Sequence, residues 1–228
     1  MSRKIAKDVT LLFLAALLVR VGYALFFVEP EYLLIEDQAL YIQLAQQFPE
    51  SGFLGVIHER VPGYPLFISS IYTVFGESLW NIISIQILLD SASCVVIALM
   101  AKSLFGKGFW IAGMLSVINL NMIILSTSLL TDTLFLFLFI LFIFSLLQYL
   151  QSERTRWLTL LVLFISLATL VRPSSYYLLP ILLIGLVSWM LWHRDTILKI
   201  GALTVLYLVI AGVLLGSIHQ RNYQQYGS

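Results

Sequence analysis

Charged residues are scarce in this sequence: Asp, Glu, Lys and Arg make up only 11% of the 228 residues, whereas 60% are hydrophobic. The mean hydropathy is +0.96. A water-soluble domain carries about a quarter charged residues. The chain therefore has too little polar surface to cover a globule in water, and we predict an integral membrane protein.

Clusters of basic residues and pairs of cysteines are also absent. The formal net charge is +1, which argues against a nucleic-acid partner because phosphate binding needs gathered Lys and Arg. The single cysteine, Cys94, cannot form an intramolecular disulfide and lies in an apolar stretch, which is typical of a buried thiol. No cluster of residues has metal-ligand spacing, so we expect no metal.

Long apolar runs predict the membrane helices. A helix that crosses the hydrocarbon core needs about 20 residues, and backbone groups in lipid must bond within their own helix. Seven runs near that length lie at residues 8–28, 79–101, 109–127, 133–151, 157–171, 176–192 and 197–217. We therefore expect an all-α, polytopic membrane protein with about seven spans, forming a single transmembrane domain over residues 1–228.

The distribution of Lys and Arg predicts the orientation, because cytoplasmic connections carry an excess of both. With a cytoplasmic N-terminus, the inner side holds nine of them: Arg3, Lys4, Lys7, Lys102, Lys107, Arg154, Arg156, Arg194 and Lys199. The outer side then holds only Arg60, Arg172 and Arg221. The N-terminus is therefore expected in the cytoplasm and the C-terminus outside.

One connection, residues 29–78, is much longer than the others, and it is too apolar and aromatic to be disordered. Residues 35–48 predict a short amphipathic helix, which we expect Pro49 and Gly52 to end. Residues 65–75 form a second apolar segment that is too short to cross. We expect this loop to fold into a cap with juxtamembrane helices on the outer face.

Few residues on the predicted outer face can carry chemistry. Glu36 and Asp37 open the first cap helix, where carboxylates are favoured by the helix dipole, and an N-terminal cap is an equally good interpretation. Asp132 starts the fourth span, where a helix cap is the simpler interpretation. Residues 58–65 predict a turn that begins with His58 and contains Arg60-Val61-Pro62-Gly63-Tyr64-Pro65. Its two prolines make the backbone rigid, and Gly63 permits an unusual dihedral.

Two charges lie within spans. Arg20 is in the first run and Asp90 in the second, at depths that differ by about 4–5 Å. An unpaired charge in lipid costs several kcal/mol, so we predict that these two side chains pair between their helices. Their expected role is structural.

Four pieces follow one another along the predicted outer face. They are Glu36-Asp37 followed by Gln38-Ala39-Leu40-Tyr41, then Arg60-Val61-Pro62-Gly63-Tyr64-Pro65, then Leu170-Val171-Arg172-Pro173, and finally Arg221-Asn222-Tyr223. In order and spacing they resemble the membrane glycosyltransferases of the GT-C class, which use a polyprenyl-phosphate sugar as donor. The protein O-mannosyltransferase group and the bacterial lipid A aminoarabinose transferase group are the most similar in appearance.

The resemblance implies an inverting direct displacement of a sugar from its lipid phosphate, without a metal or a cofactor. Asp37 would be the catalytic base, as a carboxylate can deprotonate an acceptor hydroxyl or amine, and Glu36 is the alternative. Arginine suits the leaving phosphate because its planar fork donates two bonds and stays charged. Arg172 and Arg221 would hold this phosphate, with Arg60 or His58 completing the pocket.

Four further side chains are expected to support the catalytic and phosphate-binding residues. Asp132 would orient one of the arginines, and Tyr64 and Tyr176 would stack on the sugar or line a groove for the lipid. Asn222, beside Arg221, belongs to the last of the four pieces.

Members of the resembled family are usually longer, with more spans and often an outer domain. The resemblance thus implies an N-terminal transmembrane module, completed by a C-terminal domain or a partner subunit. It also favours a bacterial inner membrane, with membrane lipids around the chain and a glycan acceptor outside. Two other classes stay open: a non-catalytic subunit that binds polyprenyl lipid in glycan assembly, and a small secondary transporter.

Overall fold

The computed structural model describes residues 3–29, 34–35, 37–55 and 60–172, together with scattered positions beyond 172. Every regular element in this described part is a helix, which confirms the all-α prediction. The eight helices are α1 (Arg3–Phe27), α2 (Asp37–Gly55), α3 (Gly63–Phe75), α4 (Leu79–Phe105), α5 (Phe109–Val117), α6 (Leu120–Thr127), α7 (Asp132–Ser152) and α8 (Thr155–Val171).

Three of the described helices, α1, α4 and α7, are long and apolar enough to cross a membrane, as predicted. The pair α5 and α6 passes the same test together but bends by 53° at its break, so the third predicted span is a broken one. The fifth run forms α8, an apolar helix of 17 residues. The spans expected at 176–192 and 197–217 lie outside the described residues.

The break in the third span replaces the continuous helix that we expected over residues 109–127. Helix α5 ends at Val117, and the Asn119 side chain caps α6 by accepting a hydrogen bond of 3.1 Å from the backbone N–H of Met122. Asparagine is a preferred N-cap residue, so Asn119 was the local signal for a new helix start. Hydropathy alone does not register it, because one polar residue barely changes the average of a long apolar run.

Arg20 explains how this break is tolerated inside the bundle. Its guanidinium is fully buried and pairs with Asp90, as predicted. It also donates to the backbone carbonyls of Ser116 and Val117, at 3.4 Å each, which are two of the last carbonyls of α5. The last carbonyls of a helix lack partners within it, so one buried side chain ties together α1, α4 and the broken span.

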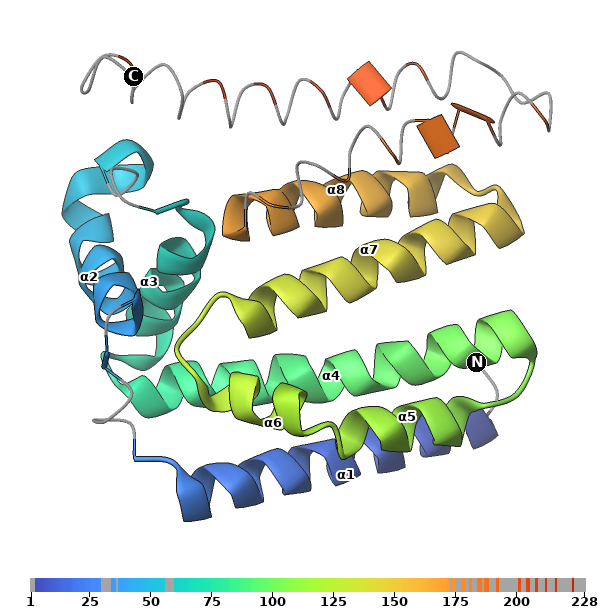
Figure 1. The fold of residues 1–228 in the computed structure, drawn as a ribbon, viewed down its shortest axis with the longest axis horizontal. Helices are drawn as coiled ribbons and strands as arrows, with labels where there is room; N and C mark the ends of the chain where they lie inside the picture. Colours follow the sequence, from blue (N-terminus) through green and yellow to red (C-terminus); the bar gives the residue numbers. More distant parts are fainter. Residues whose placement is uncertain are drawn as a thin grey trace.

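The loop over residues 29–78 folds into helices α2 and α3, as predicted. The two pack on each other, and α3 also packs on α4 and α8. Figure 1 shows α2 and α3 standing across one end of the bundle, where α1 and α8 end and α4 and α7 begin. We call this the capped end; the other end, with the start of α1 and the end of α4, is the opposite end.

Helix α2 is amphipathic, with Tyr41, Leu44 and Ala45 buried. The prediction that Pro49 and Gly52 end it is wrong, because α2 continues through Pro49 to Gly55. A proline inside a helix removes one hydrogen bond and its ring crowds the carbonyl four residues earlier, but the residues beyond it keep their own N–H donors and can continue the helix.

Gly63 brings the cap against the bundle. A Cβ at this position would lie 2.5 Å from the carbonyl oxygen of Leu170 and 2.8 Å from the backbone N of Val171. The expected unusual dihedral is absent, since the described glycines with positive φ are Gly76, Gly106 and Gly108. Gly63 is therefore needed for a close approach of backbones, which holds the start of α3 beside the end of α8.

Replacing Gly63 by Ala is accordingly expected to destabilise the protein by about 1–3 kcal/mol, because the methyl group meets backbone rather than a flexible side chain. Thermal unfolding in detergent measures this change. The matched control is Gly22→Ala in α1, where a Cβ would have nothing within 4 Å. Equal transition temperatures for the two variants would contradict the role given to Gly63.

Candidate active site at the capped end

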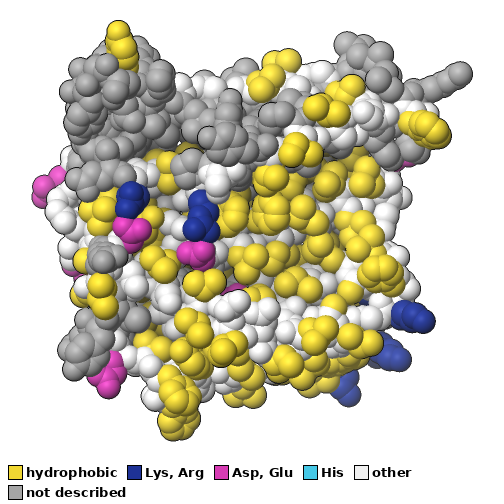
Figure 2. Space-filling view, in the orientation of Figure 1, with side chains coloured by type: hydrophobic (Ala, Val, Ile, Leu, Met, Phe, Trp, Pro, Cys, Tyr) yellow, Lys and Arg dark blue, Asp and Glu magenta, His cyan; other side chains and the backbone are white. Residues whose placement is uncertain are grey.

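Among the described residues, two ion pairs lie at the capped end. Arg60, in the turn before α3, donates to the carboxylate of Asp37 at 2.5 Å, and Arg172, directly after α8, donates to that of Asp132 at 2.8 Å. Figure 2 shows two adjoining pairs of basic and acidic side chains on one face of the molecule. The four side chains are 27–54% exposed. Such exposed pairs add little stability, so a ligand can compete for them at low cost.

Both carboxylates occupy the first residue of a helix. Asp37 begins α2 and Asp132 begins α7, where the helix dipole favours negative charge. The capping residue of α7, Thr131, makes no cap bond with its side chain, and the Asp132 carboxylate goes to Arg172. The predicted contact between Asp132 and an arginine is therefore present, and its role toward a ligand stays a prediction.

Arg172 is positioned by more than its carboxylate partner. Its guanidinium lies over the ring of Phe135, 5.7 Å from the centroid, one helical turn after Asp132 on α7. Cations over an aromatic face are attracted by the ring quadrupole. The planar group is therefore oriented before any ligand arrives.

Tyr41 lies on α2, the helix that Asp37 begins. Its side chain is buried on α2, and burial is the main reason why the pKa of its hydroxyl is raised. Arg60 and Arg172 lower this pKa, whereas Asp37 and Asp132 raise it. All four charges therefore act on the pKa of this one hydroxyl, as expected when both ion pairs lie at the same end of the bundle. No role was expected for Tyr41, although its spacing of four residues from Asp37 places both on one helix face.

Tyr64 does not occupy the position that we expected. It is 0% exposed, and its hydroxyl donates to the side-chain carbonyl of Gln86 at 2.6 Å. Its ring meets the edge of Tyr41 and stacks on Phe67, with centroids 5.0 and 6.0 Å away. In this structure the second residue of α3 points into the core, so its ring is not exposed for stacking on a sugar, and its expected role toward the sugar or the lipid stays a prediction. We call this buried ring, which contacts Tyr41, the floor of the site.

The floor is tied to the rest of the bundle through Gln86. Its amide nitrogen donates to the carbonyls of Ser126 and Ser128, at 3.3 and 2.7 Å, around the end of α6. Burial raises the pKa of the Tyr64 hydroxyl well above its usual value, so it remains a donor. A continuous chain of hydrogen bonds therefore joins α3 and α4 to the connection that precedes Asp132.

Five predicted site residues lie outside the described residues: Glu36, His58, Tyr176, Arg221 and Asn222. Their roles stay predictions. Within the part of the chain that the structure describes, no three His, Cys, Asp or Glu side chains gather as metal ligands would. The described site itself consists of arginine forks and carboxylates, which suit an anionic leaving group beside a proton acceptor.

A family model described as dolichyl-phosphate-mannose-protein mannosyltransferase matches residues 59–216, which is more than half of the chain. The matched region includes Arg60, Asp132 and Arg172 and begins after Asp37. Neither a curated protein nor a solved structure matches the chain.

Proposed function

Since the chain belongs to the dolichyl-phosphate-mannose-protein mannosyltransferase family of membrane glycosyltransferases, we propose that it transfers a sugar from a polyprenyl-phosphate carrier to an acceptor on the outer face of the inner membrane. The observation that carries this proposal is the pair of partly exposed arginines, Arg60 and Arg172, each held by a carboxylate at the capped end. The arginines and the carboxylates provide the two chemical roles that the reaction needs.

The donor phosphate would bind between the guanidinium groups of Arg172 and Arg60. Each fork can donate two parallel hydrogen bonds to phosphate oxygens and stays charged as the phosphate leaves. Asp132 orients Arg172 through the contact of 2.8 Å. Arg221 would add a third cation, and His58 is a further candidate for the same pocket.

Asp37 would accept the proton of the acceptor. As the acceptor oxygen or nitrogen bonds to the anomeric carbon, the bond from that carbon to the phosphate oxygen breaks and its electron pair leaves with the carrier phosphate. A single displacement of this kind inverts the anomeric centre. Phosphate binding to Arg60 would release the Asp37 carboxylate from its ion pair, so donor binding precedes base action. Glu36 is the alternative base.

A second candidate function is supported by the same ion pair. With Asp37 engaged by Arg60, the chain can also act as a polyprenyl-lipid-binding subunit that presents the carrier to another protein. Sugar transfer by the purified chain separates the two functions. The transporter alternative is disfavoured because the described charges within the spans, Arg20 and Asp90, are buried and paired with each other.

Replacing Arg172 by Ala is expected to weaken the binding of polyprenyl-phosphate mannose by about 10–100-fold, since charge-assisted hydrogen bonds contribute about 1.5–3 kcal/mol. Native mass spectrometry of the purified protein with the donor measures this change. Arg172→Lys keeps the charge without the fork and should recover part of the affinity.

The matched control is Arg156→Ala, which removes an exposed arginine at the opposite end of the bundle, where it lies over Trp157. It should leave donor binding unchanged. Two results together would refute the proposed donor site. The donor would bind no more tightly than an ordinary anionic phospholipid, and Arg172→Ala would not change its affinity.

A further inference from the structure

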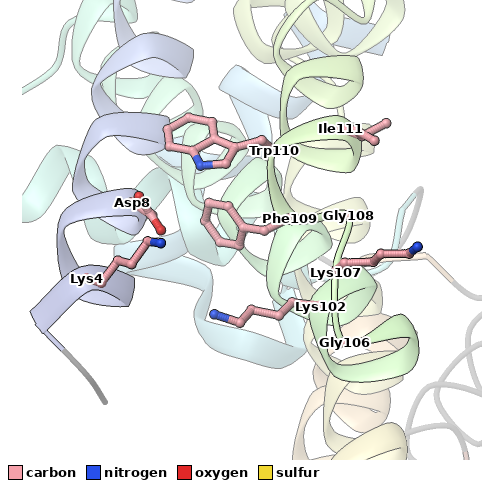
Figure 3. A pocket seen from close by; sticks show the side chains of 9 residues that line it. All are labelled: Lys4, Asp8, Lys102, Gly106, Lys107, Gly108, Phe109, Trp110 and Ile111. Atoms are coloured by element: carbon pink, nitrogen blue, oxygen red, sulfur yellow. The ribbon is translucent and has the colours of Figure 1, made fainter.

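A second basic site lies at the opposite end of the bundle. A pocket of about 430 Å³ opens between the start of α1, the end of α4 and the start of α5. Figure 3 shows Lys4 on α1 and Lys102 on α4 extending into the same space beside the rings of Phe109 and Trp110. Lys107 also lines the pocket, and its side chain points outward. Nothing in the proposed transfer reaction uses these residues.

The pocket carries uncompensated positive charge. Within the part of the chain that the structure describes, no carboxylate lies within 4.0 Å of the ammonium groups of Lys4, Lys102 or Lys107. Asp8 lines the pocket too, one turn after Lys4, without forming an ion pair with it. Two lysines, Lys4 and Lys102, extend into the pocket against one carboxylate, and Lys107 adds positive charge at its edge, so the pocket is suited to an anion.

The start of α5 adds to this preference. Helix α5 has nine residues, and its capping residue, Gly108, provides no side-chain bond to the first N–H groups. Gly108 and the first residues of α5 line the pocket. The uncapped N–H groups at a helix start and the helix dipole favour a bound anion. The lysines and the start of α5 therefore both favour an anion in this pocket.

The walls of the pocket indicate where the anion comes from. Trp110 and Ile111 are 42% and 71% exposed on α5, which belongs to a broken membrane span. Tryptophan is enriched where a membrane meets water, and basic pockets between membrane helices bind lipid headgroups. A free phosphate ion gains nothing from an exposed apolar wall, whereas a phospholipid places its acyl chains against it.

We propose that this pocket binds the headgroup phosphate of an anionic phospholipid from the leaflet at the N-terminal side, which the positive-inside distribution predicts to be cytoplasmic. The site is separate from the candidate active site. Helix α4 has 27 residues and runs between the two ends, so about 40 Å separates them. The proposal does not depend on the transfer reaction.

The test measures phosphatidylglycerol binding to the purified full chain by native mass spectrometry, with phosphatidylcholine as the neutral reference. Wild type should prefer phosphatidylglycerol. The double variant Lys4→Gln/Lys102→Gln should lower its affinity about 25-fold, since each lysine near an anionic headgroup contributes about fivefold. The matched control Lys7→Gln/Arg154→Gln removes two charges from the same end, outside the lining of the pocket, and should change binding less than twofold.

Three results would overturn the proposal. The first is equal binding of phosphatidylglycerol and phosphatidylcholine. The second is an equal loss in both double variants, which would mean that the whole basic end attracts lipid without a site. The third is displacement of the lipid by millimolar inorganic phosphate, which would identify free phosphate as the ligand. Arg172→Ala should leave phosphatidylglycerol binding unchanged. The failure of the proposed phospholipid site can therefore be distinguished from the failure of the proposed donor site.

Discussion

Replacing Asp37 by Asn is expected to slow sugar transfer by about 10²–10⁴-fold, while donor binding changes little. An amide has the size of the carboxylate but cannot accept a proton, so the acceptor keeps its hydrogen in the transition state. The lost ion pair with Arg60 is half-exposed and contributes little to stability. Release of polyprenyl phosphate from radiolabelled polyprenyl-phosphate mannose, in membranes that contain the chain, measures the rate.

The matched control is Asp132→Asn, the same change at the other helix start. Because Asp132 acts through Arg172, its loss should raise KM for the donor more than it lowers kcat, whereas Asp37→Asn should lower kcat. Full activity of Asp37→Asn would refute its assignment as the base, and Glu36→Gln would then test the alternative. Wild type that binds donor without any transfer would favour the lipid-binding subunit.

Replacing Arg20 by Leu is expected to destabilise the protein by about 3–5 kcal/mol, because Asp90 is left as an uncompensated buried charge. The change also removes the donors to the carbonyls of Ser116 and Val117 at the break in the third span. We therefore expect Arg20→Leu to be more harmful than Asp90→Leu. Chemical or thermal unfolding in detergent measures both variants.

The double variant Arg20→Leu/Asp90→Leu separates charge from packing. It removes both buried charges, so it should recover part of the stability that Arg20→Leu loses. The carbonyls at the end of α5 stay without Arg20, so recovery should be incomplete. Arg154→Leu, at an exposed site, is the control and should change stability by less than about 0.5 kcal/mol. Two single variants as stable as wild type would contradict the role of this pair.

Several features of the fold could be predicted from sequence because they depend on local composition. The runs over 79–101 and 133–151 became α4 and α7, since about 20 consecutive apolar residues form a membrane helix whatever lies beside them. The segment at 65–75 is too short to cross and forms most of α3. The pairing of Arg20 with Asp90 followed from their similar depth and from the cost of leaving either charge alone in lipid.

The candidate site was predicted as a set of residues on one side, and the tertiary structure decided how they combine. Sequence alone does not say that Asp37 meets Arg60 while Asp132 meets Arg172. The first contact depends on α2 packing on α3 and the second on α7 packing on α8. The packing of α3 against α8, which the backbone approach at Gly63 allows, brings the two pairs to the same end of the bundle. Tyr41 joins the site because its ring on α2 meets Tyr64 on α3.

Tyr64 shows most clearly what could not be predicted from the sequence. Its neighbours along the chain suggest an exposed turn, yet its ring is the buried floor of the site because α3 turns that face toward α4, where Gln86 accepts its hydroxyl. Local sequence determined that this protein is a helical membrane protein with a cap on one end. Which side chains line the site was decided only by which helix faces meet, since that depends on packing between segments far apart in the chain.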